Sequence, residues 1–166
     1  MTEKKLVLSK AVIEKKMERI ALEIAGELFE EKEALIIVGI AGSGIVVAEK
    51  LKTLLFPLLN MPLHLITCQL NKKHPLEITY STEIDFNGKN VLLVDDVTSS
   101  GRTMMYALKP LLQFYPKKVQ TMCLVERMHK SFPIQINFIG LSIATTLQNH
   151  IHVDVEEGIL TGAYIL

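Results

Sequence analysis

The first regular pattern in the chain runs from residue 10 to about residue 31, where apolar side chains recur every three or four positions. Lysines and glutamates fill the positions between them, so the segment has one apolar and one charged face. Ser9 stands just before the pattern and is a residue type that commonly caps a helix N-terminus. The spacing predicts an amphipathic helix to about Glu31. Its buried face is expected to hold Ile13, Met17, Ile20, Ile24 and Leu28.

Further along, short uninterrupted apolar runs alternate with segments of helical pattern. Runs of this length are typical of parallel strands that are buried on both faces. The expected strands cover residues 34–38, 62–70, 91–94, 119–125 and 134–139, and the expected helices cover residues 45–55 and 104–114, with Pro110 bending the second. Strands alternating with helices predict an α/β fold with a doubly wound, mostly parallel sheet flanked by helices.

Two regions depart from this alternation. Residues 71–89 are irregular and end near an Asn87–Gly88 turn, while residues 151–155 alternate between apolar and polar positions before a last apolar segment, residues 163–166. No internal repeat, low-complexity tract or linker divides the chain. We therefore expect one domain over residues 1–166.

The most informative segment, residues 91–103, reads VLLVDDVTSSGRT. Its apolar strand ends in Asp95 and Asp96, and a loop of small residues leads on into the next helix. Such a loop can aim backbone N–H groups at an anion, and its hydroxyls add short donors. Adjacent carboxylates suit a vicinal diol, which they hold by paired hydrogen bonds. The pattern predicts a sugar-phosphate site with the phosphate on Thr98, Ser99, Ser100, Gly101, Arg102 and Thr103.

The alternative is a buried strand that ends in a polar turn, with Asp96 or Thr98 capping the next helix. Two consecutive acids and four hydroxyl residues around one glycine are hard to assemble by chance, and this favours the binding site. A second glycine-rich turn, residues 39–44 (GIAGSG), follows the first strand of the expected sheet. Because sheets of this kind bind ligands beyond the carboxyl ends of their strands, we expect both turns in one site.

Composition narrows the classes of function. The 166-residue chain carries 18 basic and 18 acidic residues, and only three of the basic residues are arginines, so no nucleic-acid surface is indicated. Cys68 and Cys123 lie in apolar runs far apart, and we interpret them as buried free thiols of a reduced cytosol. The N-terminus is too charged for a signal peptide, and no apolar run is long enough to span a bilayer. We therefore expect a cytoplasmic protein without a membrane partner.

Residues 91–103 resemble the phosphoribosyl-pyrophosphate signature of the type I phosphoribosyltransferases. The resemblance implies their fold, which includes a small hood region, and their activity. These enzymes transfer a phosphoribosyl group from phosphoribosyl pyrophosphate to a nitrogenous base, with Mg²⁺ and release of pyrophosphate. It also implies that Asp95 and Asp96 are the catalytic acids and hold the ribose diol. The metal would be carried by the substrate near Asp95, without a direct protein ligand.

The same resemblance assigns the remaining loops. The turn after the first strand corresponds to the pyrophosphate loop, and residues 71–89 correspond to the mobile loop that closes over the reactants. The implied pyrophosphate ligands are Ala41, Gly42, Ser43, Gly44, Lys72 and Lys73. Relatives often carry a basic side chain in the first of these loops, and this chain does not. The alternative for the two lysines is a solvated position on the loop.

Residues 124–146 resemble the C-terminal half of the bacterial pyrimidine-operon attenuation regulators, which also have uracil phosphoribosyltransferase activity. The hypoxanthine enzymes share this layout but place a lysine where Glu126 stands, at a position that faces the edge of the base. A carboxylate only accepts hydrogen bonds, so the resemblance implies a base with an N–H or amino edge toward Glu126, and Ile139 as a further base contact. The alternative for Glu126 is a local ion pair with Arg127 or Lys130.

Three functions remain open. The leading one is a phosphoribosyltransferase of nucleotide metabolism that uses a nucleobase, with uracil favoured. The second is an RNA-binding regulator of pyrimidine genes that senses phosphoribosyl pyrophosphate or a nucleotide; the neutral charge argues against it, and we expect no RNA partner. The third is a catalytically weak nucleotide-binding homologue, favoured by Ala41, by Ser43 and by Ser99, which stands where the hypoxanthine enzymes have an aspartate. A homodimer, common in the family, is compatible with all three.

Overall fold

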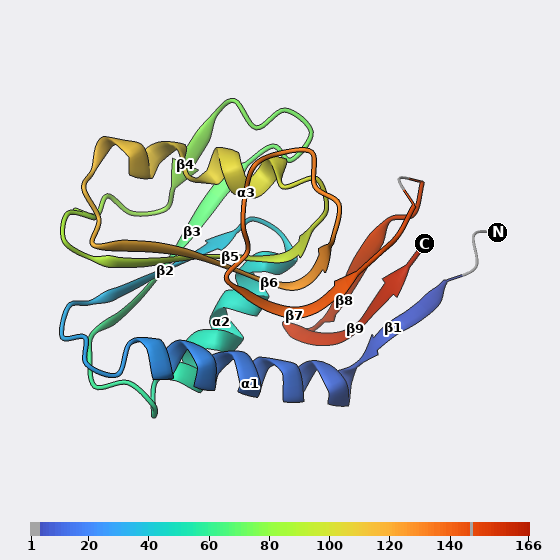
Figure 1. Ribbon diagram of the computed structural model, residues 1–166, viewed down its shortest axis with the longest axis horizontal. Helices are drawn as coiled ribbons and strands as arrows, with labels where there is room; N and C mark the ends of the chain where they lie inside the picture. The colour runs from blue at the N-terminus through green and yellow to red at the C-terminus, as the bar shows by residue number, and fades with distance from the viewer. Residues whose placement is uncertain (1–3, 147) are drawn as a thin grey trace.

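The computed structural model describes residues 4–146 and 148–166, which form a six-stranded sheet with a three-stranded sheet beside it (Figure 1). The strands of the larger sheet are β2 (Leu35–Ile40), β3 (Leu63–Leu70), β4 (Ile78–Tyr80), β5 (Asn90–Thr98), β6 (Lys118–Arg127) and β7 (Phe138–Ile143). Their order is β4-β3-β2-β5-β6-β7, and every neighbouring pair is parallel except β3 with β4. The mostly parallel sheet is therefore confirmed.

The smaller sheet, which we call the hood sheet, contains β1 (Lys5–Ser9), β8 (Ile151–Glu156) and β9 (Ile159–Ile165) in the order β1-β9-β8. It joins the two ends of the chain, because β1 pairs with β9. In Figure 1 it stands to one side of the larger sheet. This placement agrees with the small hood region that the resemblance implied.

The helices lie on both faces of the larger sheet (Figure 1). On one face lie α1 (Lys10–Glu27) and α2 (Ser43–Leu55), and on the other lie α3 (Arg102–Ala107) and the 3₁₀ helix η1 (Lys109–Gln113). The Ser9 side chain accepts a hydrogen bond from the backbone N–H of Val12, so Ser9 caps α1 as predicted. All five apolar positions predicted for the buried face of this helix are buried.

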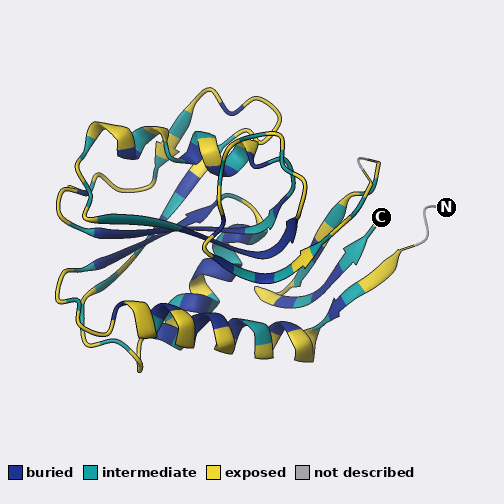
Figure 2. Cartoon of the chain, in the orientation of Figure 1, coloured by how far each residue is buried: buried dark blue, intermediate teal, exposed yellow. Residues whose placement is uncertain are grey.

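The strands of the larger sheet divide the core into two layers. Alternate side chains of β2 point to opposite faces: Leu35 and Ile37 pack with α1 and α2, whereas Ile36 and Val38 pack on the α3 side. Every residue of β2 is buried, and Figure 2 shows the central strands as the most deeply buried part of the molecule. This burial on both faces is the reason that the strand reads as a continuous apolar run.

Local structure departs from the expectations in several places. The first helix, expected to about Glu31, ends at Glu27. Strand β1 had no prediction because it is short, only partly buried and depends on pairing with β9 at the far end of the chain. The strand expected at residues 134–139 begins only at Phe138; before it, the Asn137 side chain accepts a hydrogen bond from the backbone N–H of Thr121. The helix expected over residues 104–114 ends at Ala107 and continues as η1, because Pro110 lacks the N–H group that an α-helix needs.

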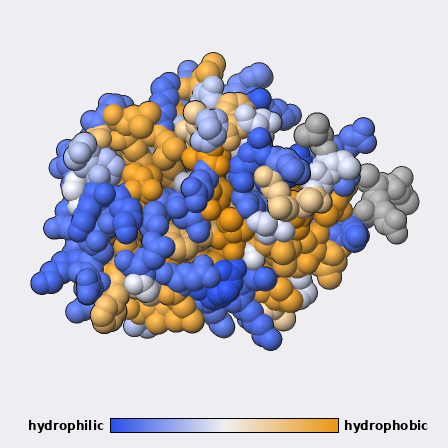
Figure 3. Space-filling view, in the orientation of Figure 1, coloured by the Kyte–Doolittle hydropathy of each residue, from blue (hydrophilic) through white to orange (hydrophobic). Residues whose placement is uncertain are grey.

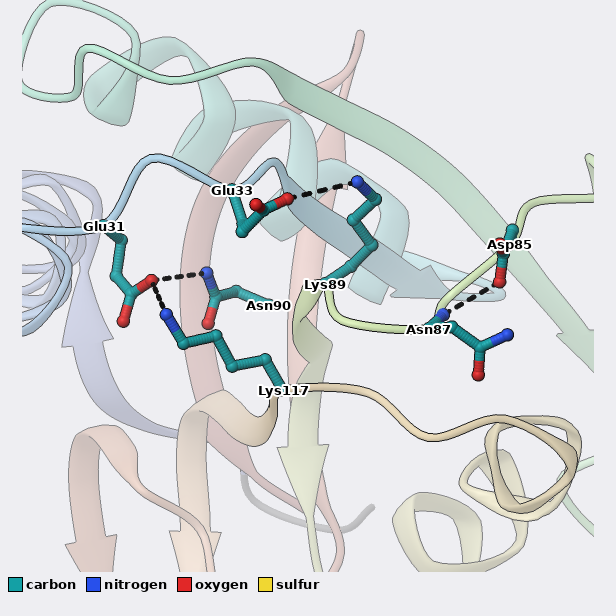
Figure 4. Close-up of polar contacts among 7 residues, drawn as sticks. All are labelled: Glu31, Glu33, Asp85, Asn87, Lys89, Asn90 and Lys117. Atoms are coloured by element: carbon teal, nitrogen blue, oxygen red, sulfur yellow. Dashed lines mark hydrogen bonds and ion pairs between the residues drawn. The ribbon is translucent and has the colours of Figure 1, made fainter.

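At the amino-terminal ends of the parallel strands, a polar cluster ties the first helix to the sheet (Figure 4). The Lys117 ammonium donates to the Glu31 carboxylate at 2.6 Å, and the amide of the buried Asn90 reaches the same oxygen at 3.5 Å. Beside them, Lys89 pairs with Glu33 at 3.3 Å. The contacts connect the segment after α1 with the residues at which β5 and β6 begin, and they leave these charges paired.

The surface carries isolated apolar side chains among charged ones. Figure 3 shows hydrophobic surface over the hood sheet, where Leu6 and Ile159 are about half exposed. On α1, lysines and glutamates occupy most of the exposed positions. Within the described residues, no helix is both long and apolar enough to cross a membrane.

Both cysteines are free thiols and both are fully buried, as predicted. Burial raises the pKa of Cys68 and of Cys123 to about 12. Because the thiolate is the reactive form, neither side chain is activated as a nucleophile at neutral pH.

The close approach of β6 and β7 generates a stability prediction. A Cβ atom added at Gly140 would lie 2.3 Å from the backbone oxygen of Leu124, so Gly140→Ala must push the two strands apart. We expect the free energy of unfolding, measured by urea denaturation, to fall by about 1–3 kcal/mol. The matched control is Gly26→Ala in α1, where nothing lies within 4 Å and the change should be neutral or stabilising by up to about 1 kcal/mol. Equal effects of the two substitutions would contradict this packing.

Candidate functional site

A cavity of about 240 Å³ lies where β5 ends, between the loop that follows this strand and the first residue of the hood strand β8. It lies at the carboxyl ends of the parallel strands, the edge at which open α/β sheets bind ligands. The residues lining it are Lys72, Asp95, Asp96, Val97, Thr98, Ser99, Ser100, Gly101, Arg102, Thr103, Met104 and Ile151. The whole predicted sugar-phosphate segment therefore surrounds one cavity.

The loop between β5 and α3 owes its shape to Gly101. This residue has a φ angle of +85°, and a Cβ atom there would lie 2.4 Å from the Ile134 side chain, so only glycine fits without strain. The backbone N–H groups of Ser131 and Phe132 both donate to the Ser100 carbonyl at 3.0 Å. The Ser100 hydroxyl in turn accepts from the backbone N–H of Arg102. The loop is thus fixed by neighbouring backbone.

Arg102, the first residue of α3, lines the cavity and can meet a ligand. Its guanidinium lies 5.2 Å from the centre of the Phe132 ring, a cation–π contact that leaves its N–H donors available. Thr98, the last residue of β5, also lines the cavity, but within the described residues its hydroxyl oxygen is fully buried and has no hydrogen-bond partner. An arginine at this cavity fits an anionic ligand such as a phosphate.

The acid pair, Asp95 and Asp96, lies at the entrance to this loop, and its two members differ in burial. Asp95 is 1% exposed, and one of its oxygens accepts the backbone N–H of Asp96 at 2.9 Å. The Lys72 ammonium lies 3.0 and 3.3 Å from the two Asp95 oxygens and 3.6 Å from an oxygen of Asp96. Burial raises the pKa of Asp95 well above its usual range, the Asp96 charge adds to this, and Lys72 opposes it. Lys72 is therefore the counter-ion that this buried carboxylate needs.

The glycine-rich turn after β2 lies beside the acid pair. Gly42 has a φ angle of +91° and leads into α2, whose second residue, Gly44, packs directly on Asp95. A Cβ atom at Gly44 would lie 2.7 Å from an Asp95 carboxylate oxygen. The expectation that the two turns meet at one edge of the sheet is therefore met.

Several predicted site residues do not line this cavity. Within the described part of the chain, its lining omits Ala41, Gly42, Ser43, Gly44, Lys73, Glu126 and Ile139. The first four lie in the neighbouring turn, and Lys73 is exposed on the loop after β3. Ile139 packs into the core on the α3 side, paired in register with Cys123. The pyrophosphate and base roles of these residues stay predictions.

Glu126 lies at the same sheet edge as the acid pair, since it is in register with Thr98 of β5 and Ser142 of β7. Both of its carboxylate oxygens are engaged: the Lys130 ammonium and the Ser142 hydroxyl each donate to it at 2.5 Å. The ion pair is largely buried. The local pairing with Lys130 that was left open as an alternative is thus present, and a base would meet a carboxylate and an ammonium together.

Two parts of the site could not be predicted from the sequence. Ile151 closes the cavity from the hood sheet, which its distance along the chain from the signature could not indicate. Phe132 supports Arg102 from the segment after β6 and stacks edge-on with Tyr106 of α3. A Phe and an Ile in apolar surroundings read as ordinary core positions, so only the tertiary structure identifies them.

The carboxylate oxygens of the acid pair fit a weakly held divalent cation. Within the described residues, no group of three or more acidic, histidine or cysteine side chains could hold a metal. Asp95 and Asp96 nevertheless place two hard oxygen donors at the cavity, and Mg²⁺ commonly takes one or two carboxylates and completes its shell with water and substrate phosphates. The acid pair would hold such an ion weakly by itself and more firmly together with a ligand.

Comparison with known proteins decides the family. A profile of the phosphoribosyl transferase domain matches residues 8–157. The chain is 32% identical over 169 residues to the "Bifunctional protein PyrR" of Bacillus cereus (strain B4264) and equally to that of Bacillus anthracis (strain A0248), covering 95% of this chain and 93% of each relative. The chain belongs to the phosphoribosyl transferase family. The predicted type I phosphoribosyltransferase, and with it the predicted enzyme class, is confirmed.

Solved structures share the fold of this phosphoribosyltransferase at low identity. The hypoxanthine phosphoribosyltransferase of Trypanosoma cruzi superposes with a TM-score of 0.79 at 15% identity and covers 98% of this chain and 95% of its own. A hypoxanthine-guanine phosphoribosyltransferase (hpt-2) from Bacillus anthracis str. 'Ames Ancestor' gives 0.72 at 16% identity, with 96% of each chain covered. At this identity the likeness establishes the fold alone.

Proposed function

We propose that the protein transfers the 5-phosphoribosyl group of phosphoribosyl pyrophosphate to a nucleobase, with uracil preferred, and releases pyrophosphate. One observation carries this proposal: a buried carboxylate and its neighbour stand at the entrance of a hydroxyl-lined cavity that ends in an arginine. A sugar phosphate needs two kinds of partner: its diol donates hydrogen bonds to acids, and its phosphate accepts them from donors such as an arginine. This site offers both side by side.

Each side chain of the cavity takes a defined part in this function. Asp95 and Asp96 accept hydrogen bonds from the ribose 2′ and 3′ hydroxyls, and the burial of Asp95 strengthens its share of these bonds. The donors of Arg102 and the hydroxyls of Ser99 and Ser100 suit the 5′-phosphate. Ile151 covers the cavity from the hood and excludes water from part of it.

In the reaction, the bond between the anomeric carbon and pyrophosphate weakens before the base nitrogen attacks, so positive charge grows on the ribose and negative charge on the leaving group. The chain orients the ribose through the acid pair and the phosphate loop, which reduces the entropic part of the barrier. The carboxylates of the pair also stabilise positive charge on the nearby sugar. Mg²⁺ would neutralise the pyrophosphate charge when bound with the substrate.

The choice of uracil rests on Glu126 and its partner. The carboxylate accepts from an N–H group, and the Lys130 ammonium, 2.5 Å from it, can donate to a carbonyl next to that N–H. Uracil presents an N–H between two carbonyls. A lysine at the strand position, as in the hypoxanthine enzymes, offers only a donor. The carboxylate at this strand position is the difference from the hypoxanthine enzymes on which the preference for uracil rests.

The site assignment predicts the effect of removing the acids. In the double variant Asp95→Asn/Asp96→Asn, we expect calorimetry with phosphoribosyl pyrophosphate and Mg²⁺ to show affinity lost by more than tenfold. Each lost charge-assisted hydrogen bond is worth about 1.5–3 kcal/mol. Glu33→Gln, a charge neutralised at the opposite sheet edge, is the control and should bind as the wild type. Unchanged affinity in a folded double variant would contradict the assignment.

The base assignment predicts a change of preference on charge exchange. Glu126→Lys alone would place two ammonium groups together, so we combine it with Lys130→Glu, which keeps the ion pair and reverses it. We expect the ratio of kcat/KM for hypoxanthine over uracil to rise by at least tenfold relative to the wild type, about 1.4 kcal/mol. Efficient hypoxanthine transfer by the unaltered protein would refute the preference for uracil.

The likeness to proteins named bifunctional raises RNA binding as a second function, and the charges of the structure argue against it. Of the three arginines, Arg19 bonds Glu23 and the backbone oxygen of Ile139, and Arg127 is buried against Thr145. Lys4, Lys89, Lys117 and Lys130 are each paired with a carboxylate, in separate parts of the molecule. A single-stranded RNA site needs a cluster of unpaired basic groups to neutralise several phosphates.

We therefore expect no specific binding to a pyrimidine-operon leader RNA at physiological salt, with or without a uridine nucleotide. A gel-shift titration against a scrambled RNA of equal length measures this. A true site would lose affinity steeply with salt, with a slope in log K of about −0.7 per neutralised phosphate. Tight, sequence-dependent and nucleotide-stimulated binding would make regulation the primary function.

A further inference from the structure

Lys72 stands out because it holds the acid pair although it belongs to a loop. Its ammonium contacts both oxygens of Asp95, at 3.0 and 3.3 Å, and lies 3.6 Å from Asp96. The side chain of Asp95 is 2% exposed, whereas that of Lys72 is 42% exposed and lines the open cavity. The ammonium thus reaches from the solvent side onto a carboxylate that cannot move.

The two partners differ in how firmly the fold holds them. Asp95 is part of β5, which is hydrogen-bonded between β2 and β6, and Gly44 packs against it. Lys72 follows the end of β3, in a turn where the Asn71 side chain accepts from the backbone N–H groups of Lys73 and His74. Exposed loop segments with few buried contacts open at low free-energy cost. If the pair separates, the lysine is the partner that leaves.

The position that the ammonium occupies is the one that the proposed function needs. A divalent cation and the ribose hydroxyls would approach the same oxygens of Asp95 and Asp96 from the same cavity. A carboxylate oxygen that already accepts from an ammonium at 3.0 Å cannot take a cation in the same direction. The Lys72 ammonium therefore obstructs a ligand that approaches the acid pair from the cavity.

We propose that Lys72 is a tethered counter-ion of the acid pair that competes with the divalent cation and the ribose diol, and that their binding displaces it into the cavity. The assignment of the diol rests on the proposed function. The competition with a cation does not, because it follows from the carboxylates alone.

Cation binding to the free protein tests this competition. Mn²⁺, a hard divalent ion with the ligand preferences of Mg²⁺, is titrated by calorimetry at constant ionic strength. We expect Lys72→Met to bind it roughly tenfold or more tightly than the wild type, because removing a competitor restores the fraction of competent sites. Lys72→Arg should resemble the wild type. Lys89→Met removes a lysine of equal charge from the Glu33 pair at the opposite edge and should change nothing. Equal affinity of Lys72→Met and the wild type would overturn the proposal.

The wild-type protein allows a second measurement, which does not depend on how a variant folds. Lysine acylation with an amine-reactive ester is followed by peptide mass spectrometry with and without saturating Mn²⁺. We expect the labelling rate of Lys72 to rise at least threefold with the ion, while that of Lys89 stays constant. A rate unaffected by the ion would refute displacement. If both metal measurements succeed and no base is a substrate, the proposed function fails while the competition stands.

Discussion

The burial of the Asp95 carboxylate is the constraint on which the rest of the site depends. A charged group at the end of a central strand, 1% exposed, is costly unless it is paired and hydrogen-bonded. Three neighbours meet that requirement: the backbone N–H of Asp96, the Lys72 ammonium and the space left by Gly44. The second residue of α2, Gly44, must therefore be small, and the loop after β3 supplies the cation. The arrangement of three separate loops follows from one carboxylate.

The features that sequence could predict are those carried by neighbouring residues. The periodicity of α1, its Ser9 cap and the two-sided burial of β2 are local, and so is the signature from Asp95 to Thr103, whose strand, loop and helix are contiguous. The failures have the opposite character. The pairing of β1 with β9 joins Lys5 to Ile165, and the shift of β7 depends on a contact with Thr121 of β6. The pattern of apolar and polar residues within one segment contains no information about contacts with a distant segment.

The same distinction between neighbouring and distant residues applies to the site. The residue types of the phosphate loop indicated their chemistry, but their partners came from elsewhere: Lys72 from the loop after β3, Phe132 from the segment after β6 and Ile151 from the hood sheet. For Glu126, the sequence suggested Lys130, four residues away, and could not suggest Ser142 on the adjacent strand. A base that meets a carboxylate already bound to an ammonium experiences a neutral, bipolar edge. The presence of a glutamate at position 126 does not by itself show that its charge is paired.

The ion pairs at the two ends of the larger sheet differ in how firmly the fold holds the cation. At the amino-terminal ends, lysines at the starts of strands pair with Glu31 and Glu33, and both partners are held by the sheet or by segments adjoining it (Figure 4). Such pairs are complete, and a ligand would have to break them. At the carboxyl ends, the strand holds only the acid, and the cation arrives on a loop. A buried carboxylate whose counter-ion can leave is both stable without a ligand and able to exchange partners. A strand-end acid in this fold can therefore be part of the core and line a ligand-sized cavity at once.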